Sequence, residues 1–331
     1  MTYKEDFYRM LDGKTPASDI PFQTFNPDPP ADFVPEVAMV MPDIANFMTM
    51  SEDNKNKWGV EYSFDYLATG PLPTPGKFML TDVKKWRDVV KAPYIEGYDF
   101  KAAAEKDMAM QIKDSDFQLK SSFGLGGAFF LNLSGFMGFE GTMLAMYDEP
   151  DALHELLGYM CDYDVWVATN VLDNYDIDVV GFGDDNATEM NPFISVEMFR
   201  EFLLPYYKRL YQVAVDRGLP ISYHNCGRCE DFMDDMVAIG TKIWNCATPR
   251  NDLNAFRARH DYKIICEVMP RFYADYTEEE TRSKVRDYID TYAPGGAFVW
   301  SGMAEMNSPG GQQVNEWIVD EVGKYGKGYY L

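Results

Sequence analysis

Basic residues, histidines and long apolar runs are all scarce in this chain of 331 residues. Its 30 lysines and arginines stand against 53 aspartates and glutamates, a net charge of −23 that repels nucleic-acid phosphates and anionic membranes. No uncharged apolar run reaches the roughly 18 residues of a membrane span, and the first residues lack the apolar core of a signal peptide. We therefore expect a soluble, cytoplasmic protein whose partners are neither nucleic acids nor membranes.

Cysteine occurs in an odd number, five, without an export signal, so a disulfide framework is disfavoured. Metal ligation and simple burial are the alternatives. Only three histidines are present, which leaves few ways to combine imidazole and thiol groups in one site.

Eight short apolar runs bounded by turn residues predict buried strands, and helical periodicity lies between the later ones. The predicted strands span 20–25, 57–62, 118–123, 178–183, 219–225, 241–247, 263–268 and 297–302. Helices are predicted over 150–175, over 195–216 with Ser195 as N-cap, and from Thr277 onwards.

Eight βα units close into a (β/α)8 TIM barrel, so we expect one α/β barrel domain over residues 1–331. A doubly wound open sheet is the alternative, but it would need fewer strands or a clear second domain. The proline-rich stretch 25–120 is less regular and is expected to form loops and extra helices over the barrel mouth.

The segment 223–227 (Tyr-His-Asn-Cys-Gly) follows an apolar run and therefore lies at the C-terminal end of a predicted strand. Residues two apart in a strand face the same side, so the imidazole of His224 and the thiol of Cys226 converge, as in half of a tetrahedral zinc site. Cys266, at the end of another predicted strand, is the expected third ligand, and Cys246 is a weaker alternative. Three protein ligands with one open position are typical of catalytic zinc.

Other interpretations of these cysteines stay open. Cys226 and Cys229 form a C-x-x-C pair, for which redox chemistry is an alternative. Buried cysteines are also commonly inert small apolar side chains, which is the interpretation favoured for Cys161 and Cys246.

Carboxylates follow one of the predicted strands. Asp184 and Asp185 come directly after the strand 178–183, where they can position a substrate proton or hydrogen-bond to a ligating histidine. A turn with a helix-capping role is the alternative. Glu267, next to Cys266, is a further candidate for a catalytic acid or a fourth ligand.

Aromatic side chains near the predicted strand ends are expected to line an apolar pocket for a flat ring. The expected substrate-binding residues are Phe130, Phe182, Tyr223 and Trp300.

On these features the chain resembles the uroporphyrinogen decarboxylase superfamily, and within it the cobalamin-dependent methyltransferases. The resemblance extends over nearly the whole chain, and its most specific part is His224-Asn225-Cys226-Gly227 after a strand. Further similar segments are 78–82 with Trp86, 183–185, 191–195, 199–202 and 205–207. The resemblance implies a (β/α)8 barrel, in agreement with the strand count.

True decarboxylases of this superfamily carry paired arginines after the first strand, suited to a porphyrinogen's carboxylates. Residues 22–28 contain no arginine here, and the only one before Trp86 is Arg9. Porphyrinogen decarboxylation is therefore not expected.

Two methyltransferase types remain. One transfers methyl from a corrinoid to a thiol, with zinc held by His-x-Cys and by a last-strand cysteine, where this chain has Met303. The other transfers methyl from donors such as methoxylated aromatics to a corrinoid protein, and the spacing of Cys226 and Cys266 resembles its zinc pattern.

The resemblance thus implies a zinc-dependent methyltransferase of the O-demethylase type. Zn2+ would be held by His224, Cys226 and Cys266 and would act as a Lewis acid on the ether oxygen. A partner protein would carry the corrinoid (cobalamin) that accepts the methyl group. The alternatives are transfer from a methylcorrinoid to a thiol or to folate, and a non-catalytic barrel that binds a corrinoid or porphyrinoid.

Overall fold

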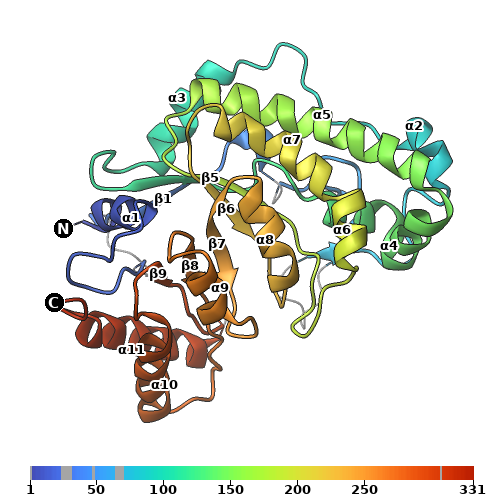
Figure 1. Ribbon diagram of the computed structural model, residues 1–331. Helices are drawn as coiled ribbons and strands as arrows, with labels where there is room; N and C mark the ends of the chain where they lie inside the picture. Colours follow the sequence, from blue (N-terminus) through green and yellow to red (C-terminus); the bar gives the residue numbers. More distant parts are fainter. Residues whose placement is uncertain (1, 24–31, 47–48, 64–70, 306–307) are drawn as a thin grey trace.

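The structure, a computed structural model, describes residues 2–23, 32–46, 49–63, 71–305 and 308–331 (Figure 1). Its largest sheet is parallel, with neighbouring strands in chain order. These strands are β5 (Val180–Gly183), β6 (Ile221–His224), β7 (Thr241–Ala247), β8 (Ile265–Val268) and β9 (Phe298–Trp300).

Further pairings extend this sheet at both edges. β1 (Val37–Val40) and β4 (Leu119–Ser122) form a parallel pair, and a bridge from Ser121 to Val179 joins β4 to the start of β5. At the other edge, Phe22 forms a parallel bridge with Trp300 of β9. The strand order from β1 round to the Phe22 segment is that of the expected (β/α)8 barrel.

Helices lie outside the strands, and α5 packs beside α7 as α10 does beside α11 (Figure 1). The α-helices are α1 (Tyr3–Leu11), α2 (Trp86–Val89), α3 (Phe100–Gln111), α4 (Phe129–Asp148), α5 (Pro150–Asn174), α6 (Val196–Phe202), α7 (Leu204–Val215), α8 (Glu230–Ala238), α9 (Leu253–Arg259), α10 (Glu278–Tyr292) and α11 (Pro309–Tyr325). Short 3-10 turns occur at η1 (Asp43–Ala45) and η2 (Val83–Lys85). Among the described residues, no helix has both the length and the apolar composition needed to cross a membrane.

Helix starts follow the predicted capping residues. Ser195 accepts a hydrogen bond from the amide of Met198 at the start of α6, and Thr277 forms a capping box with Glu280 at the start of α10. The single helix predicted over 195–216 is instead two helices, α6 and α7, that meet at Leu203. Pro205 in the first turn of α7 explains the break, because proline cannot donate the hydrogen bond that would continue α6.

The N-terminal third differs most from the prediction. The strand predicted over 57–62 is not a barrel strand, because only β2 (Tyr62–Ser63) forms there and it pairs antiparallel with β3 (Leu72–Pro73). The barrel strand of this region is β1, at a position where no strand was predicted. Of the strand predicted over 20–25, residues 24 and 25 lie outside the described part, and Phe22 supplies the bridge to β9.

One end of the barrel is closed by α1. Its buried side chains pack against interior residues near the N-terminal ends of several strands, and Leu119 and Ile265 are the first residues of β4 and β8. The cluster comprises Tyr3, Phe7 and Met10 of α1 with Leu119, Val179, Ile243, Ile265 and Val299. His224, the last residue of β6, therefore lies toward the opposite, open end, where (β/α)8 barrels carry their sites.

We predict that Phe7→Ala lowers the free energy of unfolding by about 3–5 kcal/mol, because it leaves a cavity between α1 and the strands. Met110→Ala, at a side chain that is 64% exposed, is the control and should change it by less than about 0.5 kcal/mol. Denaturant titration measures both. A small effect of Phe7→Ala would mean that α1 does not close the barrel in solution.

Candidate functional site

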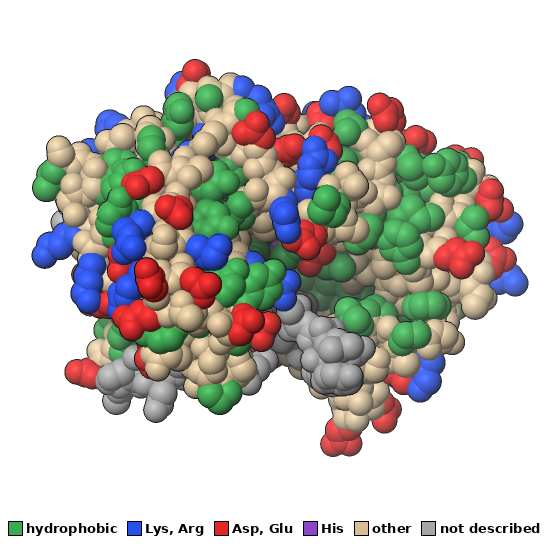
Figure 2. Space-filling view, turned by 90° about the horizontal axis from the view of Figure 1, so that it is seen from below, with side chains coloured by type: hydrophobic (Ala, Val, Ile, Leu, Met, Phe, Trp, Pro, Cys, Tyr) green, Lys and Arg blue, Asp and Glu red, His purple; other side chains and the backbone are tan. Residues whose placement is uncertain are grey.

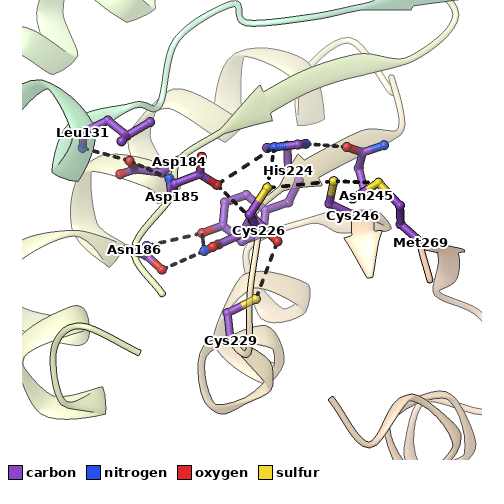
Figure 3. A network of polar contacts seen from close by, with 12 residues as sticks. Leu131, Asp184, Asp185, Asn186, His224, Cys226, Cys229, Asn245, Cys246 and Met269 are labelled. Atoms are coloured by element: carbon purple, nitrogen blue, oxygen red, sulfur yellow. Dashed lines mark hydrogen bonds and ion pairs between the residues drawn. The ribbon is translucent and has the colours of Figure 1, made fainter. Parts of the chain in front are cut away.

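The site begins where the chain turns sharply after β6. Gly227 has φ +88°, and a Cβ atom there would lie 2.3 Å from the carbonyl oxygen of Thr188, so glycine is required. The amide of Cys226 donates to Oδ1 of Asp185 at 2.9 Å, after the neighbouring strand β5. The turn brings Sγ of Cys226 to 3.5 Å from Nε2 of His224 (Figure 3).

A second thiol, that of Cys246, joins this pair. Its Sγ lies 4.0 Å from Sγ of Cys226, and the donor atoms of His224, Cys226 and Cys246 all lie within 4.8 Å of one another. No other group of His, Cys, Asp and Glu donors in the described part of the chain comes together in this way. In a tetrahedral zinc site the donor atoms are separated by about 3.3–3.8 Å, given Zn–S of about 2.3 Å and Zn–N of about 2.0 Å. The His224–Cys226 pair already has this spacing, and a closer approach of Cys246, by about 1 Å at most, would let the three side chains hold a zinc ion.

Cys246 faces the other two donors because β7 is irregular at this point. Trp244 pairs with Cys266 and Ala247 with Val268, so two residues of β7 stand opposite one residue of β8. This is a β-bulge, and Cys246 has φ +58°, a conformation that is uncommon for a residue with a side chain. Such local strain is typical of functional sites. Cys246 is only a weaker alternative on sequence grounds, and no residue pattern there signals the bulge.

Cys266 does not join the cluster, which corrects the predicted ligand set. It is wholly buried and pairs with Trp244, whose ring packs on Phe256 of α9 at 5.0 Å between centroids. Burial raises the pKa of Cys266 to about 12, partly offset by Arg257 of α9. Adjacent strand residues face opposite sides, and since Glu267 faces the barrel interior, Cys266 faces the helices.

Asn245 links His224 to a buried carboxylate, and the sequence analysis missed it. Oδ1 of Asn245 lies 2.5 Å from Nδ1 of His224, while Nδ2 of Asn245 donates to Oε2 of Glu267. Burial raises the pKa of Glu267, against the hydrogen bond from Asn245, which lowers it. Glu267 thus lies in the interior, as expected of a site residue, but its contact is with Asn245 and not with the donor cluster.

The electrostatics of the cluster favour a thiolate at Cys226. The hydrogen bond with Cys246 lowers the pKa of Cys226, burial opposes it, and His224 lowers it further, with a resulting value of about 6. Burial lowers the pKa of His224, but the contacts with Cys226 and Asn245 outweigh it and raise the pKa to about 9. The pKa of Cys246 is raised by its hydrogen bond with Cys226. One thiol therefore ionises readily, as metal ligation requires.

Asp184 anchors a helix. Its two carboxylate oxygens accept hydrogen bonds from the amides of Phe130 (2.7 Å) and Leu131 (3.0 Å) at the start of α4, from the hydroxyl of Tyr207 (2.6 Å) and from the amide of Asp185. Burial raises its pKa to about 7, while the bonds from Tyr207 and the α4 amides lower it. The capping alternative therefore describes Asp184 better than a catalytic role does.

Asp185, by contrast, lies beside the donor cluster. Its Oδ1 is 4.0 Å from Nε2 of His224, and its side chain is 39% exposed. Of the two adjacent carboxylates, only Asp185 is placed to reach a bound substrate.

The predicted aromatic pocket is not where the sequence analysis expected it. Phe182 stacks on Tyr211 of α7 at 4.9 Å, and Tyr223 packs against Tyr207 at 6.0 Å, so both lie between the sheet and the helices. Phe130, in α4, is 1% exposed and stacks on Phe193.

Trp300 is likewise buried, and its ring packs 6.1 Å from Phe272. The aromatic ring beside the donors is Phe123, which follows β4 and meets the ring of His224 edge-on at 5.7 Å. Figure 2 shows a face of the molecule that is hollowed at its centre, between hydrophobic and acidic side chains.

The C-x-x-C pair is not brought together as a pair. Cys229 is wholly buried at the start of α8, and its Sγ contacts the carbonyl oxygen of Asn225 at 4.0 Å. Burial raises the pKa of its thiol. The sulfur that Cys226 contacts is that of Cys246, which favours metal ligation over C-x-x-C redox chemistry.

Fold and site together define a (β/α)8 barrel with a His–Cys–Cys donor cluster near the C-terminal ends of its strands. Residues 122–303, more than half of the chain, match the uroporphyrinogen decarboxylase (URO-D) family, and the chain belongs to that family. No curated protein matches the chain in sequence.

Two solved structures are similar in fold. A methyltransferase from Methanosarcina mazei is 11% identical, with a TM-score of 0.59 over 98% of this chain and 99% of that one. At this identity the match shows a common fold over the whole length. A dihydropteroate synthase from Anaplasma phagocytophilum is 14% identical over 51% of this chain and 68% of that one, and its TM-score of 0.34 is too low for an argument.

Alkylation of the metal-free protein with iodoacetamide tests the electrostatics of Cys226. The thiolate is the form that reacts, and the pKa of Cys226 is lowered to about 6. We therefore expect the alkylation rate to fall only below about pH 6, whereas for an ordinary thiol it falls below about pH 8.5. Cys246→Ala removes the largest cause of the shift and should move the midpoint upward. Mass spectrometry of the Cys226 peptide follows the reaction, and a midpoint above pH 8 in both proteins would contradict the assignment.

Replacement of each aspartate by asparagine separates the roles of Asp184 and Asp185. Asp184→Asn replaces one carboxylate oxygen by an NH2 group and sets it against two of the four donors, so we expect the free energy of unfolding to fall by about 2–3 kcal/mol. Asp185→Asn keeps an oxygen for the Cys226 amide and should cost less than about 0.5 kcal/mol. Equal losses of stability in urea titrations would argue against this division.

Proposed function

We propose that this protein is a zinc-dependent methyltransferase that transfers a methyl group from a methoxylated aromatic donor to a corrinoid carried by a partner protein. The observation that supports it most is the convergence of the His224 imidazole and the Cys226 and Cys246 thiols at the open end of the barrel. Membership of the URO-D family and the fold shared with a methyltransferase agree with this proposal.

His224, Cys226 and Cys246 would hold the zinc ion, and the partly exposed His224 and Cys226 leave one side of the cluster open to a substrate. When bound, zinc supplies Lewis acidity toward the oxygen of a methyl ether. Asp185, partly exposed beside His224, is placed to contact a substrate that binds at the cluster. The ring of Phe123 offers a flat apolar surface for an aromatic substrate.

A partner protein is consistent with the surface next to the site. α4, whose first amides bind Asp184, leaves four large apolar side chains between 42% and 73% exposed. They are Leu131, Phe139, Leu144 and Tyr147. Figure 2 shows hydrophobic side chains gathered over the side of the molecule where α4 lies in Figure 1. Exposed apolar patches of this kind are typical of interaction surfaces.

Transfer from a methylcorrinoid to a thiol is a second candidate. By the family resemblance, that type holds zinc with one histidine and two cysteines. The last-strand position has Met303, but Cys246 of β7 supplies a second thiolate, so the donor set has the same composition. Here the metal-bound group would be the thiol that accepts the methyl group.

Reduced Co(I) corrinoid distinguishes the two directions. Incubation with the enzyme and a panel of methoxylated aromatics should produce the absorption spectrum of methyl-Co(III). No methylation from any donor, together with methylation of a thiol by methylcobalamin, would favour the second candidate.

The metal content tests the ligand set. We expect about one zinc per chain in the wild type and in Cys266→Ser. Zinc binding should be at least about 10-fold weaker in Cys246→Ser, because Cys246, unlike Cys266, is one of the donors. Chelator competition and elemental analysis measure this. Loss of zinc in Cys266→Ser alone would restore the ligand set predicted from sequence, and a wild type that binds no zinc would favour the non-catalytic barrel.

A further inference from the structure

Three inward-facing side chains on consecutive strands form a hydrogen-bonded row beneath the donor cluster. His224 of β6 pairs in register with Asn245 of β7, and the pairing of Trp244 with Cys266 just before the bulge places Asn245 beside Glu267 of β8. Nδ1 of His224 meets Oδ1 of Asn245 at 2.5 Å (Figure 3). Nδ2 of Asn245 donates to Oε2 of Glu267. Glu267 is 8% exposed and has no other role in the proposed chemistry.

The direction of this row follows from its last member. Nδ2 of Asn245 faces Oε2 of Glu267 in the structure, and a Glu267 carboxylate in its ionised form only accepts hydrogen bonds, which fixes this orientation of the Asn245 amide. Its carbonyl oxygen is then the atom that faces His224, and it can only accept. Nδ1 of His224 therefore carries a proton. When the ring gives up its other proton to bind a metal ion, the lone pair is on Nε2, the nitrogen that faces Cys226.

We propose that Glu267 is a positioning residue that, through Asn245, holds His224 in the tautomer and ring orientation in which Nε2 can bind zinc. The inference rests on the proposed zinc site and adds Glu267 as the residue that orients His224, the one histidine among its ligands. Metal-binding histidines commonly donate their other N–H to a carboxylate or carbonyl group. Here the carbonyl group is that of the Asn245 side chain, and its orientation is set by the Glu267 carboxylate on the next strand.

The substitution Glu267→Gln tests the direction of the row. The new glutamine side chain would offer both a donor and an acceptor to Asn245, so the amide of Asn245 could reverse and favour the wrong tautomer of His224. We expect Glu267→Gln to bind zinc about 10-fold more weakly than the wild type, the lower end of the effect of such partners. Competition with a chromophoric chelator measures the affinity.

A double variant supplies the rescue. When Asn245→Asp is combined with Glu267→Gln, the introduced carboxylate accepts from both Nδ1 of His224 and the introduced amide, so the original direction at His224 returns. We expect zinc affinity within about threefold of the wild type and a downfield Nδ1 proton signal of His224, weakened in Glu267→Gln and restored in the double variant. The chain has only three histidines, so the signal is readily assigned.

Asp164→Asn is the matched control, because it also changes a buried carboxylate. Asp164 accepts a hydrogen bond of 2.9 Å from the amide of Gly127 and is not one of the donors of the cluster. The substitution should lower the melting temperature and leave zinc affinity unchanged. Wild-type affinity in Glu267→Gln, or a double variant as weak as Glu267→Gln, would overturn the positioning role. A wild type that binds no zinc would instead overturn the proposed function.

Discussion

The alternation of side chains along parallel strands is the constraint on which the site depends. Successive residues face opposite sides, so β6, β7 and β8 place His224, Asn245 and Glu267 in the barrel and turn Tyr223, Trp244 and Cys266 toward the helices. The bulge at Cys246 is a local departure from this alternation in β7, and it brings the second thiol to the cluster. A conformation of this kind costs about 1–3 kcal/mol, which the surrounding sheet must offset.

The same polar network connects the site to the helices around it. Asp184 and Asp185 are adjacent, yet one caps α4 and the other holds the Cys226 turn. The position of Cys226 is thus tied to β5 and, through Asp184, to the start of α4. A partner that moved α4 would act on the site through this short connection.

How far the sequence predicted the site depends on the residue. His224 and Cys226 were recognisable because they follow a strand at a spacing of two, and the structure brings them together. Cys266 and Glu267 could not both face inward, so strict alternation alone would have excluded one of them. Cys246 was recognisable only as a weaker alternative, because its left-handed backbone is set by the neighbouring strands and not by its own residue type. β1 was missed because the four-residue run lies between prolines 35 and 42, which are typical of loops.

The packing of α1 has a consequence for biosynthesis. The apolar face of this helix is buried by side chains that extend to Val299 in β9, which is translated long after α1. Until β9 has been made, Phe7 and Met10 lack part of their native contacts, so these apolar side chains stay incompletely covered in the nascent chain. Barrel closure is thereby a late event, since contacts so distant in sequence form slowly.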